Sequence, residues 1–331
     1  VLTEKTEDVL NMIRKIKDSG IEIIGVELGS ELSNKSYFDK GLLIDDYIKK
    51  SELISNAIKI SFPEILTAVV AAPLLENKNH RHYIWNKKLS HLSFYDAIIV
   101  HSYAKVVKGK DQYGQMILEE NEGEKESSFL IYKKRVLDFF KDYYPKEIKN
   151  YNSIFDDTPI WITEWNLQYS KKTGNTLLQG LFVANYFLEL ISKDDYKSIE
   201  LTTFHNLAGR DFGGSIFQMK NNKTYIQSTF YPIQLLSNIF STEKLKVFSK
   251  KLTDDIFQYS FFMHKKLKKV IVINWNDEEF FIDKNSFNKK TEYYSKYLFD
   301  LNSDNEGLIY KTSNIEGGRI LIKPYSLTLV E

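Results

Sequence analysis

A helix-then-strand pattern recurs five times in the first two thirds of this chain and limits the folds that are open to it. In residues 6–17 apolar side chains recur at helical spacing, and Asp18, Ser19 and Gly20 end this segment before the apolar run 21–26. The later predicted helices and strands cover 45–60 and 64–72, 84–92 and 95–104, 129–144 and 159–166, and 177–191 and 199–207. Helices that alternate with buried strands are typical of parallel sheets covered by helices.

Polar or aromatic side chains stand at the C-terminal ends of the predicted strands: Glu31, Pro73, His101 with Tyr103, Glu164 with Trp165, and His205 with Asn206. In a (β/α)8 TIM barrel the strands converge at these ends, and the active site lies there. An open, doubly wound sheet has the same alternation, but the sequence has no glycine-rich phosphate loop of the Rossmann or P-loop kind. We therefore expect an α/β fold with a TIM barrel.

The pattern accounts for five strands, whereas a closed barrel of this kind has eight. We predict that residues 1–240 form strands four to eight of a partial barrel and that its N-terminal strands are missing from this chain. A missing N-terminal segment or a second chain would then complete the barrel.

After Phe240 the sequence changes to short strand-like runs separated by polar turns. We predict that residues 241–331 form an antiparallel β-sandwich domain. The charged stretch 106–128 is predicted to be a solvated insertion in the loop after the third strand.

The composition excludes several classes of function. The 45 Lys and Arg residues balance 44 Asp and Glu residues, so the net charge expected of a nucleic-acid-binding protein is absent. No run reaches the roughly 18 apolar residues of a membrane span, and a chain without cysteine has no disulfide or thiolate site. His80 and His82 lie in a polar stretch, and no HExxH or comparable arrangement indicates a metal site. We predict no metal and no cofactor.

Two glutamates fit the chemistry of glycoside hydrolysis, which needs one carboxyl group as general acid and another as nucleophile or base. Glu31 and Glu164 follow the first and fourth predicted strands, so a barrel would bring both to the same face. For either residue alone, a solvated or ion-paired glutamate at the end of a strand is the competing explanation.

Three short segments resemble those of retaining clan A glycoside hydrolases. "VELGSELSN" resembles the "ELGNE" segment of heparanase-like β-glucuronidases and of related arabinofuranosidase-like and xylosidase-like families. "VHSY" is similar to their sixth-strand His/Tyr segment, and "PIWITEWN" is similar to their seventh-strand "TEW" segment. The resemblance covers residues 6–240, and a trailing β-sandwich is usual in these families. It implies that Glu31 is the acid/base, that Glu164 is the nucleophile and that Tyr103 hydrogen-bonds Glu164.

The residue before the acid/base is normally Asn in these families, and here it is Ser30. A hydroxyl is shorter than an amide and makes fewer hydrogen bonds, which fits weakened catalysis or a bulkier, substituted sugar at that position. Glu27 lies on the same side of the strand as Glu31 by period-two alternation, and we expect it to have a structural hydrogen-bonding role.

The remaining candidates each have two explanations. His101 is either a satisfied polar group at the end of its strand or a sugar contact, and the same holds for His205 and Asn206. Trp165 either stacks on a sugar ring or packs within the protein.

Together these features predict a retaining glycoside hydrolase that cleaves a poly- or oligosaccharide by double displacement. The main alternative is a non-catalytic carbohydrate-binding protein on a decayed glycosidase scaffold, which Ser30 favours. A polysaccharide lyase with Tyr103 and His101 as base and acid is a weaker third possibility, because it leaves the two glutamates unexplained. A secreted or periplasmic location is expected only by association with polysaccharide degradation.

Overall fold

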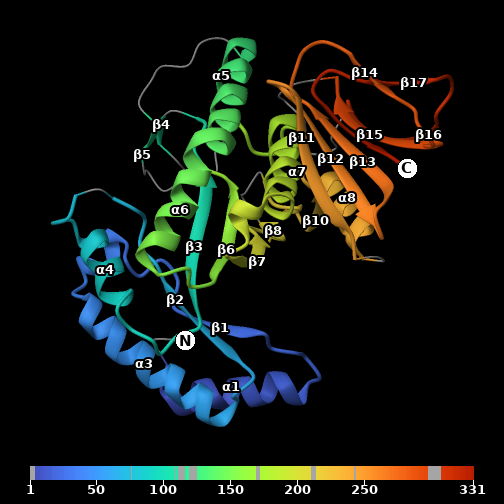
Figure 1. Cartoon of the computed structure of the whole chain (residues 1–331). Helices are drawn as coiled ribbons and strands as arrows, with labels where there is room; N and C mark the ends of the chain where they lie inside the picture. Colours follow the sequence, from blue (N-terminus) through green and yellow to red (C-terminus); the bar gives the residue numbers. More distant parts are fainter. Residues whose placement is uncertain are drawn as a thin grey trace. The chain divides into compact units, whose positions relative to one another are not determined.

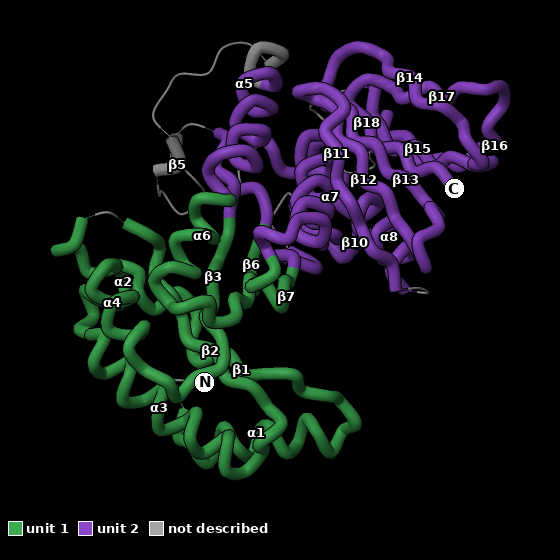
Figure 2. The backbone as a smooth tube through the Cα atoms, viewed as in Figure 1, with its two compact units in different colours: residues 1–102, 145–165, 197–203 green, residues 103–144, 166–196, 204–331 purple. Residues whose placement is uncertain are grey.

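The computed structural model describes residues 4–75, 77–107, 109–110, 116–118, 125–168, 172–209, 214–241, 244–296 and 307–331. The chain divides into two compact units (Figure 2). Unit 1 comprises Val1–Ser102, Pro145–Trp165 and Lys197–Thr203, and unit 2 comprises Tyr103–Tyr144, Asn166–Tyr196 and Phe204–Glu331. This division follows contacts in space and joins distant chain segments, so the domain boundary between residues 240 and 241 stays a prediction.

Unit 1 is built around a five-stranded sheet with helices against it (Figure 1). The strands are β1 (Gly25–Leu28), β2 (Leu66–Val70), β3 (Ala97–Ala104), β6 (Ile160–Leu167) and β7 (Ile199–Phe204), in the order β1-β2-β3-β6-β7. β1 pairs in parallel with β2, and β2 pairs in parallel with β3. The helices between them include α1 (Thr6–Asp18), α2 (Lys35–Phe38), α3 (Ile44–Ser61) and α4 (Arg81–Leu89). The expected parallel part of a barrel is therefore confirmed, with all five predicted strands.

The sheet curls as the sheet of a barrel does. Two strands separate β1 from β6 in the sheet, yet a Cβ atom added to Gly25 of β1 would lie only 2.1 Å from the ring of Trp161 on β6. The Trp161 ring therefore crosses the concave side of the sheet and lies against the backbone of β1. A glycine inside a strand often marks such a close approach, and here it leaves room for a ring that is 4% exposed.

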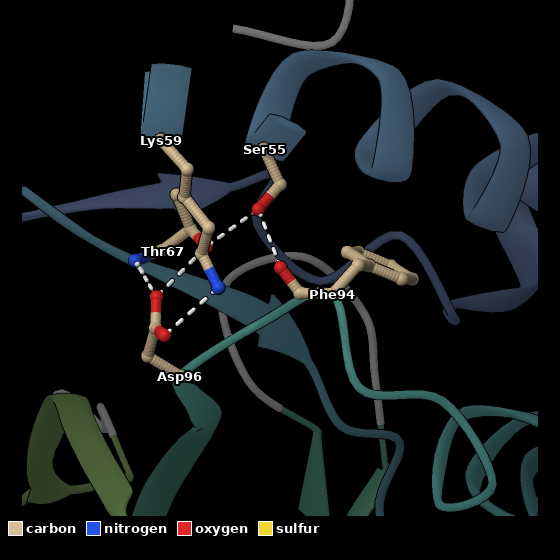
Figure 3. A network of polar contacts seen from close by, with 5 residues as sticks. All are labelled: Ser55, Lys59, Thr67, Phe94 and Asp96. Atoms are coloured by element: carbon tan, nitrogen blue, oxygen red, sulfur yellow. Dashed lines mark hydrogen bonds and ion pairs between the residues drawn. The ribbon is translucent and has the colours of Figure 1, made fainter. Parts of the chain in front are cut away.

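A polar network ties α3 to the start of β2 and to the segment that leads into β3 (Figure 3). The carboxylate of Asp96 accepts hydrogen bonds from the N–H of Thr67 at 2.8 Å and from its hydroxyl at 3.2 Å, and it pairs with Lys59 at 2.9 Å. The Ser55 hydroxyl lies 2.7 Å from the Thr67 hydroxyl and donates to the carbonyl of Phe94 at 2.6 Å. Because these polar groups satisfy one another, the network fixes the helix against the sheet.

The helix that precedes β6 is longer than the sequence predicts. α5 (Lys125–Asp138) continues through a π-helical turn (Phe139–Tyr143) into α6 (Tyr144–Ile154), whereas the predicted helix ends at residue 144. Pro145 suggests an end there, but the helix passes it by way of the π-helical turn that directly precedes α6. α7 (Leu177–Ser192) is confirmed, and α8 (Phe230–Phe240) was not predicted. None of the described helices is long and apolar enough to cross a membrane.

Several short strands were also not predicted from the sequence. β8 (Ala208–Gly209), β9 (Phe217–Lys220) and β10 (Lys223–Ile226) form a small sheet in the order β10-β9-β8. β4 (Gly109–Lys110) pairs with β5 (Met116–Leu118) inside the charged stretch 106–128, and the rest of the insertion from residue 108 to 124 lies outside the described residues.

The residues after α8 form the predicted antiparallel β-sandwich. The larger sheet consists of β11 (Lys246–Thr253), β12 (Ile256–Met263), β13 (Lys266–Asn274), β18 (Ser326–Val330), β15 (Lys289–Ser295) and β16 (Leu308–Asn314), in that order. The smaller sheet pairs β14 (Phe280–Asp283) with β17 (Arg319–Ile322). Ile256 and Val272 of the larger sheet share one buried cluster with Ile320 and Ile322 of β17, so the two sheets pack face to face.

Candidate active site

The loop after β1 presents Glu31 in an unusual backbone conformation. Gly29 has a φ of 105° and Glu31 a φ of 50°, a range in which residues with a side chain are uncommon. The side-chain amide of Asn34 donates to Oε2 of Glu31 at 2.9 Å. Non-glycine residues in this conformation cluster at functional sites, and this one places a carboxylate just beyond the end of β1.

Helix α4 holds this loop in place. The carbonyl of Ser33 accepts hydrogen bonds from Nε of Arg81 at 3.2 Å and from Nε2 of His82 at 3.0 Å. Burial, with the nearby charge of Arg81, lowers the pKa of His82 to about 4, so its ring is neutral near pH 7. His80 caps the helix by accepting from the N–H of His82 at 3.2 Å. The two histidines of the polar stretch are thus the start of α4, and both have structural contacts.

Buried side chains also fix the C-terminal ends of β1 and β2. The hydroxyl of Tyr47 on α3 donates to the carbonyl of Leu28 at 2.9 Å and accepts from the N–H of Val70 at 2.8 Å. The indole N–H of Trp85 on α4 donates to the carbonyl of Val70 at 2.8 Å. The strand ends beside the Glu31 loop are therefore held by side chains from two helices.

Glu31, His101 and Glu164 come together beside the C-terminal parts of β1, β3 and β6. Nδ1 of His101 lies 3.1 Å from Oε1 of Glu31 and 3.5 Å from Oε2 of Glu164. One oxygen of each carboxylate and one nitrogen of His101 all lie within 4.8 Å of one another. The two carboxylates selected from the sequence therefore meet around one imidazole.

The two carboxylates are more exposed to solvent than the imidazole between them. Glu31 is 49% exposed and Glu164 is 28% exposed, whereas His101 is only 11% exposed. Both carboxylates can thus be reached from solvent, while the imidazole that contacts them is mostly covered.

The charges around His101 raise its pKa. Burial by itself would lower that pKa, but the hydrogen bond to Glu31 and the negative charges of Glu164, Glu31 and Glu27 together outweigh burial. Burial raises the pKa of Glu27, and Thr163 and His101 act in the opposite direction. The charge of Glu27 therefore acts within the same electrostatic cluster, and its structural hydrogen-bonding role stays a prediction.

Ser30 and Trp165 flank the two glutamates in the sequence but differ in burial. Ser30 is exposed beside Glu31. Trp165 is 3% exposed, which fits the packing explanation better than the stacking one, and its sugar contact stays a prediction.

The other selected residues belong to unit 2. The Tyr103 ring packs edge-on against His205, with ring centroids 6.0 Å apart. A cis peptide bond joins His205 to Asn206. The hydrogen bond from Tyr103 to Glu164 and the sugar contacts of His205 and Asn206 stay predictions.

The sequence reasoning missed the residues that hold the cluster. Asn34 could have been predicted from the sequence, because it lies three positions after Glu31 and the two side chains meet across a single turn. Arg81 and His82 contact Ser33 across 48 and 49 positions, and no local pattern signals such a contact.

The same three residues have the donor atoms of a cation site. Among the described residues, Glu31, His101 and Glu164 are the group whose ligand atoms come close enough to hold a metal ion, and carboxylate and imidazole are ordinary ligands for one. The sequence predicts no metal, and that stays a prediction.

No protein-family model matches the sequence, and no curated protein matches it, but solved structures do. A family 51 α-L-arabinofuranosidase from Bifidobacterium longum superposes with a TM-score of 0.63 at 9% identity, over 92% of this chain and 66% of its own. The family 51 α-L-arabinofuranosidase from Thermotoga petrophila gives 0.58 at 14% identity, over 92% and 65%. The chain has the fold of a clan A glycoside hydrolase.

A third similar structure has a different specificity. The 4-O-α-L-rhamnosyl-β-D-glucuronidase from Fusarium oxysporum gives a TM-score of 0.57 at 11% identity, over 93% of this chain and 70% of its own. At such identities the likeness concerns the fold alone. The chain spans 65% of the length of the Thermotoga enzyme, so these glycosidases contain polypeptide beyond the part that it matches.

Proposed function

We propose that this protein is a retaining glycoside hydrolase in which Glu31 is the acid/base and Glu164 the nucleophile. The observation that supports this most is the approach of one oxygen of each carboxylate to within 4.8 Å of the other. Retaining glycosidases place their carboxyl groups about 5–5.5 Å apart, whereas inverting enzymes leave about 6.5–9.5 Å for a water molecule. The spacing in this protein supports the retaining class.

The proposed reaction has two displacements. Glu164 attacks the anomeric carbon while Glu31 gives its proton to the departing glycosidic oxygen, which yields a covalent glycosyl-enzyme. Glu31, now ionised, then takes a proton from water, and the resulting hydroxide attacks the anomeric carbon and releases Glu164. The left-handed backbone at Glu31 and its hydrogen bond from Asn34 would hold that carboxyl group at the leaving oxygen.

His101 would serve both carboxylates. Its Nδ1 atom lies within 3.5 Å of an oxygen of each, and a protonated ring there stabilises the ionised forms. Glu164 must be ionised to attack, and Glu31 must become ionised when it protonates the leaving group. One carboxylate is thus ionised before the first displacement and the other after it, and a positive charge between the two stabilises both states.

The proposed substrate is a sugar chain. The similar solved structures act on arabinofuranosides and on a rhamnosyl-glucuronide by their names, so α-L-arabinofuranosides and β-D-glucuronides are the first candidates to test. The exposed hydroxyl of Ser30 beside Glu31 leaves space for a substituent on the sugar at that position. A secreted or periplasmic location is proposed on the polymeric nature of such substrates alone.

We also propose that further strands pair with β1. In the described sheet β1 is an edge strand, and a closed barrel has no free edge. Nearby apolar side chains are exposed, with Ile24 at 62% and Leu66 at 37%. Strands from a longer form of the protein, or from a second chain, would cover them.

The test is the stereochemistry of the product. The protein is incubated with aryl α-L-arabinofuranosides, aryl β-D-glucuronides and matching oligosaccharides, and the anomeric proton of the first product is followed by NMR. We expect the released sugar to have the configuration of the substrate. Inversion would overturn the nucleophile role of Glu164.

The other outcomes select the alternatives. Binding of oligosaccharides without any release of reducing ends, in a protein whose barrel is complete, would make it a carbohydrate-binding protein. An unsaturated product that absorbs in the ultraviolet would identify a lyase, with His101 and Tyr103 as the candidates for acid and base.

A further inference from the structure

The side chain of Asn166 uses all of its hydrogen-bonding groups on four partners. Its Nδ2 atom donates to the carbonyl of His205 at 2.6 Å and to the carbonyl of Gly214 at 2.9 Å. Its Oδ1 atom accepts from the N–H of Leu167 at 2.8 Å and from Nε2 of Gln179 at 3.1 Å. A side-chain amide has two N–H donors and an oxygen with two lone pairs, so this buried amide is fully satisfied and held in one orientation.

A second amide holds the first one in place. Gln179 lies in the first turn of α7, and its Nε2 atom donates to the carbonyl of Gly214 at 3.3 Å as well as to Asn166. Its Oε1 atom accepts from the N–H of Asn175 at 3.0 Å. Gly214 has a φ of 116°, which favours glycine, and a Cβ atom there would lie 2.2 Å from Nε2 of Gln179. The absence of a side chain at Gly214 therefore lets its carbonyl reach both amides.

These contacts tie the end of β6 to the ends of the two strands beside it, which are β3 and β7. Asn166 is the second-last residue of β6, and His205 directly follows the last residue of β7. The N–H of Gln168 donates to the carbonyl of Ala104, the last residue of β3, at 2.9 Å. The ring of His205 packs edge-on against that of Tyr103 on β3. Asn166 therefore stands where three strand ends are joined.

The same strand carries Glu164 two positions before Asn166. Side chains two residues apart point to the same side of a strand, so Asn166 is the next residue on the Glu164 side of β6. A strand rises about 3.3 Å per residue, so the two residues are close neighbours along it. A shift of the backbone at Asn166 is therefore passed on to the carboxylate of Glu164.

We propose that Asn166 is a positioning residue for the nucleophile, and that Gln179 fixes the orientation of its amide. Asn166 holds the end of β6 so that the carboxylate of Glu164 is directed at the anomeric carbon. This inference rests on the proposed function and deepens it. The role requires an amide, because a carboxylate of the same shape has no N–H for the two carbonyls. An apolar side chain of similar size would leave both carbonyls and the N–H of Leu167 without a partner.

Asn274 in the β-sandwich offers a matched control. It is buried at the end of β13, and its Nδ2 atom donates to the carbonyls of Glu278 and Lys323, both at 2.9 Å. Its Oδ1 atom accepts from the N–H of Asn276 at 2.8 Å. An aspartate at either position removes two donated hydrogen bonds from a buried site. Both substitutions should therefore lower stability, and only the one at Asn166 should act on the reaction.

The test compares Asn166→Asp with Asn274→Asp in the whole chain, with activated aryl glycosides as substrates. Asn166→Asp should lower kcat by about a hundredfold, which is the effect of a reacting group displaced by about 1 Å, and should change KM by less than about threefold. Asn274→Asp should lower the melting temperature but keep kcat within about threefold of the unaltered protein. Equal kcat values for the two folded variants would make Asn166 a purely structural residue and overturn the inference.

A pH profile adds a measurement that a purely structural role would not change. The carboxyl group introduced by Asn166→Asp can donate one hydrogen bond when it is protonated, and burial raises the pKa of such a group. The kcat of this variant, divided by that of the unaltered protein, should therefore rise as the pH falls. Asn166→Leu has no group to titrate, so its ratio should stay low and constant. Parallel profiles for the two variants would contradict the role of the donated hydrogen bonds.

Two further variants keep the outcome decisive. If Asn166→Asp does not fold, Gln179→Glu takes its place, because it leaves Asn166 intact and removes only the donor to its Oδ1 atom and to the carbonyl of Gly214. It should lower kcat by about tenfold, the scale of one buried hydrogen bond, and an unchanged kcat would overturn the inference. Glu164→Gln is assayed in parallel. If it keeps its activity, the proposed function fails, and if it is inactive while Asn166→Asp turns over normally, only the positioning role fails.

Discussion

The two ends of the unit 1 sheet carry polar networks of different composition. Where β2 and β3 begin, one carboxylate, that of Asp96, is matched by the ammonium of Lys59 and by two hydrogen-bond donors of Thr67. Ser55 extends this network to the carbonyl of Phe94. Each group has a partner of opposite character, and nothing in the network needs a ligand to complete it.

At the C-terminal end, three carboxylates share one imidazole. Glu31 and Glu164 both lie within 3.5 Å of His101, and the charge of Glu27 acts on the same ring. The two carboxylates nearest to the ring are accessible to solvent.

This difference separates a network that serves stability from the one that we propose serves chemistry. Barrel enzymes carry their catalytic residues at the C-terminal ends of the strands and structural contacts at the other end. The raised pKa of His101 makes the same distinction without reference to a family, because groups with perturbed pKa values are concentrated at functional sites. Substitutions at the two ends should therefore have separable effects.

The largest effect is expected for Glu164→Gln. The substitution keeps the shape of the side chain but removes the nucleophile, so kcat on an activated aryl glycoside should fall by about four orders of magnitude or more. The melting temperature should change little, because Gln occupies the same space as Glu and the side chain is partly open to solvent. Near-normal turnover would remove Glu164 from the mechanism.

Glu31→Ala should have the next largest effect, and one that depends on the leaving group. Loss of a general acid costs about 10²–10⁴-fold in rate when the departing group needs a proton, as in an oligosaccharide. Aryl glycosides with acidic leaving groups should lose far less in the first displacement. Comparison of kcat/KM across a series of aryl glycosides measures this, and equal losses across the series would argue against the acid role.

At the opposite end of the sheet, Asp96→Ala should lower stability and leave the chemistry intact. It removes the acceptor of the Thr67 N–H and leaves Lys59 without its partner, which should cost about 1–3 kcal/mol of unfolding free energy. Denaturant unfolding measures the loss, and kcat should stay within about twofold because the proposed active site lies at the other end of the strands.

The surface pair Lys251–Asp254 offers a matched control. Asp254 is 96% exposed, so Asp254→Ala removes a carboxylate and an ion pair with little effect on unfolding. If the two aspartate variants unfold alike, the network around Asp96 is no more than a surface feature, and the contrast between the two ends of the sheet disappears.

The sequence was most informative where a signal is local and repeated. The five strands of the sheet lie where the alternation of helices and strands places them, and Glu31 and Glu164 were selected because each follows such a strand. Their proximity followed from the convergence of parallel strands. The β-sandwich could be predicted for the same reason, since its short strands recur between polar turns.

Contacts between segments that lie far apart in the sequence could not be predicted. Trp161 fits against β1 only because Gly25 has no side chain, and neither residue indicates the other. His101 was left between two explanations because its part in the cluster depends on two carboxylates 70 and 63 positions away from it. The continuation of the helix past Pro145 was not predicted, because proline usually ends a helix. Here the burial of Ile148 and Tyr151 stabilises the turns that follow it.

The smallest and most specific effect is expected for His101→Gln, and it should depend on pH. The pKa of His101 in the folded protein is raised despite its burial, above an unfolded value of about 6.5. Its stabilising contribution is therefore fully present below about pH 6.5 and is lost as the pH rises through the raised folded pKa. The difference in melting temperature between the unaltered protein and His101→Gln should accordingly be largest near pH 6 and should shrink at alkaline pH.

The loss of activity caused by His101→Gln should depend on pH in the same direction, and His82→Gln is the control. His101→Gln should reduce kcat/KM by about tenfold, the scale of one hydrogen bond to a charged group, at pH values where the ring is protonated, and by less above them. His82 has a pKa lowered to about 4, so it is neutral throughout this range, and the loss caused by His82→Gln through the Glu31 loop should not vary with pH. Parallel pH profiles for the two variants would mean that His101 only holds its neighbours in place, whereas profiles that diverge as the pH falls would show that its charge acts on the two carboxylates.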